Sequence, residues 1–369
     1  KEGRKDGVQS TIREIQILGA AYEAVGDAKM AKALYEGFQA ANPRADLVDG
    51  DLARLAAGGE APKLIAGAAD GAAEALFGIA GWLRQQNVQE TALVLGRFAE
   101  ILRPGLDVNA ILVADILEQT GRLEAANAVY AAMSADSPFS WAVRLRIANN
   151  FERLDRVGDA VKLLKAMAVE RPKSPEPMIN LGDVLRGEEK FEDALAAYNA
   201  AFERIGKPGP DHWSLYYARG ITLERTKNWP AAEADFLQAL EFQPEQPYVL
   251  NYLGYSWVEK GLHLDRAKEM IHRAVELRPH DGYIVDSLGW VYFQLGEFEQ
   301  AAKHLEKAVE LRPQDPTIND HLGDAYWRVG RFNEARFQWR RALGLDPEPD
   351  AVAAIEAKLK RGLASLDPR

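Results

Sequence analysis

The sequence predicts an all-α solenoid of stacked helical hairpins, and three observations indicate that fold class. Short motifs recur at an offset of 34 residues, as when Leu288-Gly289-Trp290-Val291-Tyr292 returns as Leu322-Gly323-Asp324-Ala325-Tyr326. Apolar residues within each unit follow the i, i+3, i+4, i+7 spacing of amphipathic helices. A proline closes the units at the same offset, as at Pro313 and Pro347. Because one hairpin cannot bury its apolar stripe alone, neighbouring units must stack.

The first helix of each unit contains a small residue, and nine units share this template. The successive spacings of that residue are 61, 34, 34, 34, 38, 34, 35 and 34. It falls at Gly19, Ala80, Ala114, Ala148, Gly182, Gly220, Gly254, Gly289 and Gly323. A small residue is expected here because a larger substituent would push the two crossing helices apart.

The second helix of each unit contains an alanine in a matching position, and a turn precedes it. The alanines are Ala31, Ala92, Ala126, Ala160, Ala194, Ala232, Ala267, Ala301 and Ala335. Several turns contain glycine, which supplies the backbone freedom that ends a helix. These turn glycines are Gly26, Gly121, Gly261, Gly296 and Gly330.

This pattern of Leu-Gly, Tyr, Gly, Ala, Ala and Pro in a 34-residue unit resembles the tetratricopeptide repeat (TPR) family. The resemblance covers roughly Thr11 to Pro349, and the long array is similar to multi-repeat TPR proteins of proteobacteria. It implies a right-handed superhelical α-solenoid that serves as a noncatalytic scaffold for protein–protein interaction. The clamp of Lys, Arg and Asn by which some TPR domains bind a chaperone's carboxylate is not expected, because the matching positions are mostly Tyr, Asp and Ile.

Departures from the template divide the chain. We expect a leader at 1–10, one repeat at 11–45, four repeats at 73–208 and four more at 213–349, with an inserted loop at 209–212. The 61-residue gap predicts a divergent helix pair with a loop at 46–72, which contains Gly58-Gly59 and Pro62. Residues 350–369 are expected to form a capping helix and tail, starting at Asp350 and ending near Gly362. The N-terminal edge has no comparable cap, so we expect further repeats upstream or a partner there.

Composition excludes several classes of function. The 369 residues include no cysteine, which excludes disulfides, cysteine-ligated metal sites and a cysteine nucleophile. The six histidines lack metal-ligand spacing, and no phosphate-binding loop or hydrolase motif occurs. We therefore expect no enzyme, no cofactor and no metal. No transmembrane segment is expected either, because the most apolar window, Ala72 to Leu83, is interrupted by Glu74. Cytoplasm and periplasm both fit the composition.

The candidate binding residues lie on the first helices, which line the concave surface in this family. Aromatic residues and carboxylates concentrate there from Tyr217 onward. The predicted partner-binding residues are Asn180, Asp183, Tyr217, Tyr248, Asn251, Tyr252, Tyr255, Tyr283, Asp286, Trp290, Phe293, Asp320, Asp324, Trp327 and Arg328. Neighbouring groove positions include Glu224, Ser287, Thr317 and His321. Aromatic faces and carboxylates together favour a protein or peptide with basic and apolar side chains.

Two alternatives stay open. We expect first a scaffold that supports assembly or quality control of a bacterial multiprotein complex, and the alternative is the TPR module of a larger membrane-anchored or enzymatic protein. The last repeat also carries the arginines 331, 336, 340 and 341, which suit an anionic partner or a solvated helix. Nucleic acid is not expected as a partner, because the net charge is −10.

Overall fold

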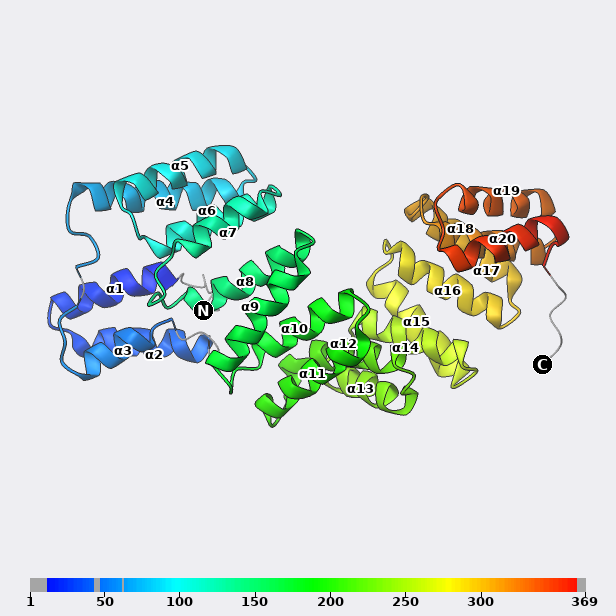
Figure 1. The fold of residues 1–369 in the computed structure, drawn as a ribbon, viewed down its shortest axis with the longest axis horizontal. Helices are drawn as coiled ribbons and strands as arrows, with labels where there is room; N and C mark the ends of the chain where they lie inside the picture. The colour runs from blue at the N-terminus through cyan, green and yellow to red at the C-terminus, as the bar shows by residue number, and fades with distance from the viewer. Residues whose placement is uncertain (1–11, 43–46, 62, 364–369) are drawn as a thin grey trace, which may run out of the picture. The chain divides into compact units, whose positions relative to one another are not determined.

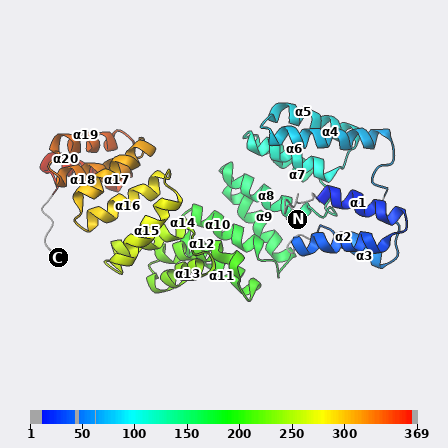
Figure 2. The ribbon, with the colours of Figure 1, turned by 180° about the vertical axis from the view of Figure 1, so that it is seen from behind.

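The structure is a computed structural model that describes residues 12–42, 47–61 and 63–363. In this part of the chain it contains twenty α-helices and one short 3-10 helix. The helices follow one another as antiparallel pairs, as Figures 1 and 2 show. The predicted all-α solenoid of stacked hairpins is therefore confirmed. The expected leader at 1–10 lies outside the described residues.

The chain divides into two compact units, residues 1–188 and 189–369. The division falls in the repeat around Gly182, between its two helices. The first unit contains α1 (Ile12–Ala24), α2 (Ala28–Ala41), α3 (Asp49–Ala56), α4 (Ala68–Gln85), α5 (Gln89–Leu102), α6 (Asp107–Gln119), α7 (Leu123–Ala131), α8 (Ser140–Arg153), α9 (Val157–Glu170) and α10 (Glu176–Gly187).

The second unit begins with α11 and ends with the last helix of the chain. It contains α11 (Phe191–Ile205), η1 (Pro210–His212), α12 (Trp213–Arg225), α13 (Trp229–Phe242), α14 (Pro247–Glu259), α15 (Leu264–Leu277), α16 (Gly282–Gln294), α17 (Phe298–Leu311), α18 (Pro316–Arg328), α19 (Phe332–Leu343) and α20 (Pro349–Arg361). The inserted loop at 209–212 thus includes the single turn η1.

The region at 46–72 differs from the predicted helix pair. It contains one helix, α3, and a loop that leads to α4, which already begins at Ala68. Val48 is fully buried beside α1 and α2, and Leu52 and Leu55 of α3 pack against the same cluster. A single helix therefore closes the first hairpin. Residues 68–72 belong to the first turn of α4.

The small-residue positions lie where the two helices of a hairpin cross. A Cβ atom added at Gly289 would lie 2.6 Å from Leu305 Cγ of α17, and one at Gly220 would lie 2.7 Å from Phe236 Cε1 of α13. Neither distance leaves room for a methyl group. The turn glycines have positive φ angles, such as 77° at Gly296 and 82° at Gly330, a conformation that side chains disfavour.

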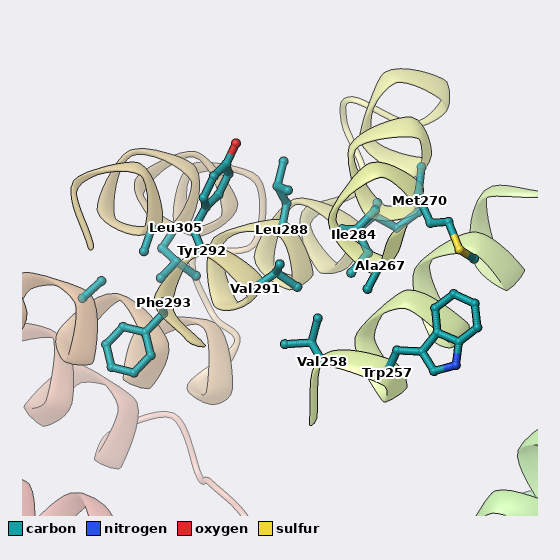
Figure 3. Packing of buried hydrophobic residues seen from close by; sticks show 14 of the residues in the cluster. Trp257, Val258, Ala267, Met270, Ile284, Leu288, Val291, Tyr292, Phe293 and Leu305 are labelled. Atoms are coloured by element: carbon teal, nitrogen blue, oxygen red, sulfur yellow. The ribbon is translucent and has the colours of Figure 1, made fainter. Parts of the chain in front are cut away.

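Stacking between hairpins makes the core of the second unit continuous. Figure 3 shows Ile284 and Val291 of α16 on the side toward Val258 and Ala267 of the preceding hairpin. All four side chains are buried in one cluster that extends to Ile355 of α20. The predicted C-terminal capping helix is α20, and its apolar face covers the last repeat.

We predict that Gly289→Ala lowers the free energy of unfolding by about 1–3 kcal/mol, because the new methyl group forces Leu305 or the helix axes to move. The measurement is urea denaturation followed by circular dichroism. Gly37→Ala in α2 is the control: nothing lies within 4 Å of its added Cβ, and alanine is the better helix former by roughly 0.5–1 kcal/mol. Equal midpoints for the two variants would contradict the crossing argument.

Candidate functional site

A cavity of about 410 Å³ opens on the first helices of the second unit. It is lined by side chains from α12, α14, α16 and α18, and we call it the tyrosine pocket. Its lining residues are Glu224, Asn251, Tyr252, Tyr255, Ser256, Glu259, Lys260, Tyr283, Asp286, Ser287, Thr317 and His321. Five of the predicted binding residues meet here: Asn251, Tyr252, Tyr255, Tyr283 and Asp286.

Sequence analysis missed three residues of this pocket, namely Ser256, Glu259 and Lys260. Glu259 lies four positions after Tyr255, so it continues the same face of α14 by one helical turn. That spacing could have identified it. Lys260 follows the last residue of α14, and its ammonium lies 4.8 Å from the centre of the Trp229 ring.

Each carboxylate of the pocket has a nearby partner that holds its orientation. The Tyr252 hydroxyl donates to Glu224 Oε2 at 3.4 Å, and the Trp290 indole N–H donates to Glu259 Oε1 at 3.2 Å. Burial raises the pKa of Tyr252, and the nearby Glu224 charge adds to the effect. Burial, assisted by Glu259, likewise raises the pKa of Tyr255. Both phenols therefore keep their protons and remain donors at neutral pH.

His321 closes one end of the pocket. Its ring lies 3.0 Å from Asp286 Oδ1 and stacks on Trp290 with the ring centres 4.0 Å apart. Burial by itself would lower the pKa of His321, but the charge of Asp286 and the hydrogen bond to it raise that pKa overall. The pair holds the imidazole against the indole at this end of the pocket.

Asn251 offers the pocket an acceptor without a partner. Its side-chain oxygen is buried and accepts no hydrogen bond from any described residue. A buried polar atom that lacks a partner costs free energy, about 1–3 kcal/mol in typical cases. Because this oxygen exposes almost no surface, a ligand could donate a hydrogen bond to it only after the Asn251 side chain turns toward the pocket.

Asp320 and Asp324 do not lie open in the groove as predicted. Lys358 of α20 contacts both, at 2.7 Å and 2.8 Å, and the Trp339 indole N–H donates to Asp324 at 2.8 Å. Burial raises the pKa of Asp324 to about 6, although Lys358 acts in the opposite direction. The two carboxylates attach the capping helix, which sequence reasoning did not include in the groove.

Other predicted residues contribute to packing around the groove. Trp327 lies against the rings of Phe332 and Trp339, and the Arg328 guanidinium faces the Phe298 ring. Phe293 is buried and stacks on Trp290. Tyr217 packs edge-on to Tyr252. Tyr248 is more exposed and lies near the guanidinium of Arg278.

Asn180 and Asp183 belong to the other unit and are not brought to the tyrosine pocket. The Asn180 amide donates to the Glu176 carbonyl at 2.8 Å, one turn earlier in α10. Asp183 lies 3.6 Å from Arg186 on the same helix. Both interactions are local to α10.

The arginines of the last repeat mostly have structural partners. Arg331 donates to Glu306 at 2.7 Å and to Glu334 at 3.1 Å. Arg341 donates to the Pro313 carbonyl at 2.9 Å, and Arg336 lies over the Trp327 ring. These contacts favour the solvated-helix alternative for the cluster, although Arg340 is exposed.

Comparison with known families agrees with this architecture. Family models of the tetratricopeptide repeat match residues 179–247 and 317–349, and a TPR repeat model matches 289–330. These stretches of the chain are TPR repeats. TPR repeats mediate protein–protein interaction, and proteins built from them are generally noncatalytic scaffolds.

Two curated relatives match part of the TPR array. The chain is 27% identical over 163 residues to the TPR repeat-containing protein PA4667 of Pseudomonas aeruginosa, which is 44% of this chain and 27% of the relative. It is 29% identical over 136 residues to the BBSome complex member BBS4 of Bos taurus, or 36% of this chain and 25% of the relative. The match therefore spans about a quarter of each relative's length.

Solved structures show the same fold. The APC/C hetero-tetramer Cut9-Hcn1 matches with a TM-score of 0.57 at 15% identity, over 96% of this chain and 76% of that chain. A tetratricopeptide repeat protein from Parabacteroides merdae matches with a TM-score of 0.52 at 18% identity, over 68% of this chain and 96% of that chain. At these identities the likeness concerns the fold alone.

Two further observations apply to the described residues. They contain no group of three or more His, Asp or Glu side chains placed to hold a metal ion. None of the helices described combines the length and the apolar composition needed to cross a bilayer.

We predict that Lys358→Met destabilises the second unit by about 3 kcal/mol at pH 8, because it leaves Asp320 and Asp324 buried without their cation. The loss should be smaller at pH 5, where the raised pKa of Asp324 allows that carboxyl to take up a proton. Thermal melts at both pH values measure this. Lys360→Met is the matched control, since Lys360 is an exposed lysine of the same helix. Equal losses for the two variants would contradict a buried pair.

We predict that His321 titrates above its ordinary pKa of 6.5 and that Asp286→Asn lowers this value. Because the folded-state pKa is raised, the stability that His321 contributes is present below pH 6.5 and is lost as pH rises through the folded value. Proton NMR of the imidazole measures the pKa directly. An unchanged pKa in the variant would show that Asp286 does not hold the charge.

Proposed function

We propose that this TPR protein is a noncatalytic scaffold that binds a peptide segment of a protein partner in the tyrosine pocket. The ligand has a basic side chain next to apolar ones. The observation that carries the proposal is the Asn251 oxygen, buried at the pocket and without a partner among the described residues. A peptide N–H is the donor that every protein ligand offers at this point.

The charges of the pocket favour a cation on the ligand. The pocket is lined by two carboxylates, Glu224 and Glu259, and by the ammonium group of Lys260. The negative charge of Asp286 is compensated by His321. Tyrosine faces and hydroxyls add contact area and attract a guanidinium or ammonium group. A Lys or Arg side chain therefore matches the pocket better than a carboxylate does.

The mechanism is preorganisation of the scaffold. Hydrogen bonds from Tyr252 and Trp290 hold the pocket carboxylates before any ligand arrives. Little side-chain freedom is then lost on binding, so more of the contact energy appears as affinity. Assembly or quality control of a multiprotein complex is the context we propose, and one curated relative is named as a complex member.

A second candidate is a TPR module within a larger protein. The match covers only 27% and 25% of the two curated relatives, so proteins with this kind of array extend well beyond it. In that case the pocket would recruit a substrate or partner to another region. Both candidate functions require that the tyrosine pocket bind a partner, so a binding experiment on the pocket tests the step that they have in common.

We predict that a peptide array with Lys or Arg beside apolar residues yields ligands that bind the intact chain. Asn251→Ala should weaken the best ligand roughly tenfold or more, because the peptide N–H loses its acceptor. Glu259→Gln should weaken Lys and Arg peptides and leave their Gln counterparts nearly unchanged. Fluorescence anisotropy with labelled peptides measures both effects.

Matched controls are available in the same unit. Asn333→Ala and Glu299→Gln alter exposed residues on α19 and α17, outside the pocket. They should bind as the unmodified chain does. If Asn251→Ala and Glu259→Gln also bind normally, the ligand lies elsewhere and the proposed site is wrong.

A further inference from the structure

We propose that His321 makes the cation affinity of the tyrosine pocket depend on pH: the pocket binds a Lys or Arg side chain more tightly once this imidazole has lost its proton. The proposal rests on the proposed function and names the regulation of the same site. His321 and Asp286 both line the pocket, and the imidazole Nδ1 lies 3.0 Å and 3.1 Å from the two carboxylate oxygens. Histidine changes its charge near neutral pH, where the other side chains of the pocket ordinarily do not.

The charge of the pocket wall follows the protonation of His321. With the proton in place, the imidazolium compensates the Asp286 carboxylate, and Glu224 and Glu259 remain to attract a cation beside Lys260. Without that proton, Asp286 is a third carboxylate in the same wall, and its charge has no compensation. A cation in the pocket is then attracted more strongly, because charges act over several ångströms where little water separates them.

The register of the hairpins places the Asp286–His321 pair next to a part of the wall that does not titrate. Asp286 lies three residues before the small residue of α16, and His321 lies two residues before that of α18. The equivalent residues one hairpin earlier are Asn251 of α14 and Ser287 of α16, which also line the pocket. Both of these side chains are neutral. At this register the charge of the wall therefore changes at the Asp286–His321 pair and not at the neighbouring step.

Two further carboxylates act on His321 from its own helix. Burial lowers the pKa of His321, while Asp286, Asp320 and Asp324 raise it, and the overall direction is upward. Lys358 of α20 contacts both Asp320 and Asp324, and neither of them lines the pocket. Burial raises the pKa of Asp324 to about 6, so this carboxyl titrates in a range close to that of histidine. An experiment must therefore separate the two groups.

Stacking keeps the imidazole beside the ligand site. The rings of His321 and Trp290 have centres 4.0 Å apart and planes within 17° of each other. The same indole stacks on Phe293 and donates its N–H to Glu259 Oε1 at 3.2 Å. These contacts involve ring faces and the indole N–H, and none of them requires a charge on the imidazole. The proton is thus gained or lost by a ring that stays in place.

Linkage fixes the sign of the effect. A cation in the pocket repels the imidazolium, so binding of a cation lowers the pKa of His321. By the same coupling, the affinity for a cationic ligand increases as pH rises through that pKa, by about five- to tenfold for a coupling of ordinary size. A ligand without a net charge has no such coupling.

The first experiment needs no peptide. Proton NMR follows the imidazole of His321 in the full chain through its titration, in methylguanidinium chloride and in sodium chloride at equal ionic strength. The resonance is assigned by its absence from the His321→Gln variant. We expect methylguanidinium to lower the pKa of His321 relative to sodium. The resonance of His280, an exposed histidine outside the pocket, should titrate alike in both salts.

The second experiment measures peptide affinity by fluorescence anisotropy. An acetylated and amidated Lys peptide and its Gln counterpart are titrated at pH values from about 5.5 to 8.5, where the charge of neither peptide changes. The Lys peptide should bind about five- to tenfold more tightly at the upper end, and the Gln peptide equally at both ends. His321→Gln and Asp286→Asn should each remove the pH dependence, whereas the control His280→Gln should retain it.

Circular dichroism melts show whether each variant is folded. Asp286→Asn keeps the imidazole and is the second variant if His321→Gln does not fold. A pH dependence that persists in folded His321→Gln would assign the effect to Asp324 and overturn the proposal.

Failure of this proposal differs from failure of the proposed function. If the Lys peptide binds with the same Kd at every pH, or more tightly at low pH, the pocket binds peptides but His321 does not regulate it. If no peptide binds while methylguanidinium still lowers the pKa of His321, the coupling is supported and the peptide ligand is wrong. Equal pKa values of His321 in the two salts would overturn the coupling itself.

Discussion

The close crossing of the two helices in each hairpin is the constraint on which the rest of the structure depends. Gly289 against Leu305 and Gly220 against Phe236 leave no space for a methyl group between the helices. This approach brings the apolar stripes of both helices to the same side, where the next hairpin covers them. The core of the second unit is therefore continuous.

The tyrosine pocket is a consequence of that stacking. Its side chains come from α12, α14, α16 and α18, which are separated by about 35 residues in the sequence. Within this pocket the Asn251 oxygen is buried and has no hydrogen-bond partner among the described residues.

The same constraint explains why the two ends of a stack differ. A hairpin that is followed by another, or by a single helix such as α3 or α20, has its second side covered. Ile79 and Trp82 of α4 remain exposed, although α1 lies beside the same helix and its Arg13 pairs with Glu74.

The sequence by itself determined the fold class, through the 34-residue period and the small residues of each unit. It could do so because these features are local: the 34-residue period and the small residues act within one hairpin and its neighbour. Only the tertiary structure decided which groove residues remain available. Lys358 pairs with Asp320 and Asp324 because α20 folds back on α18, and Arg13 of α1 pairs with Glu74 of α4. Both outcomes depend on how distant segments pack, and no periodic pattern records that.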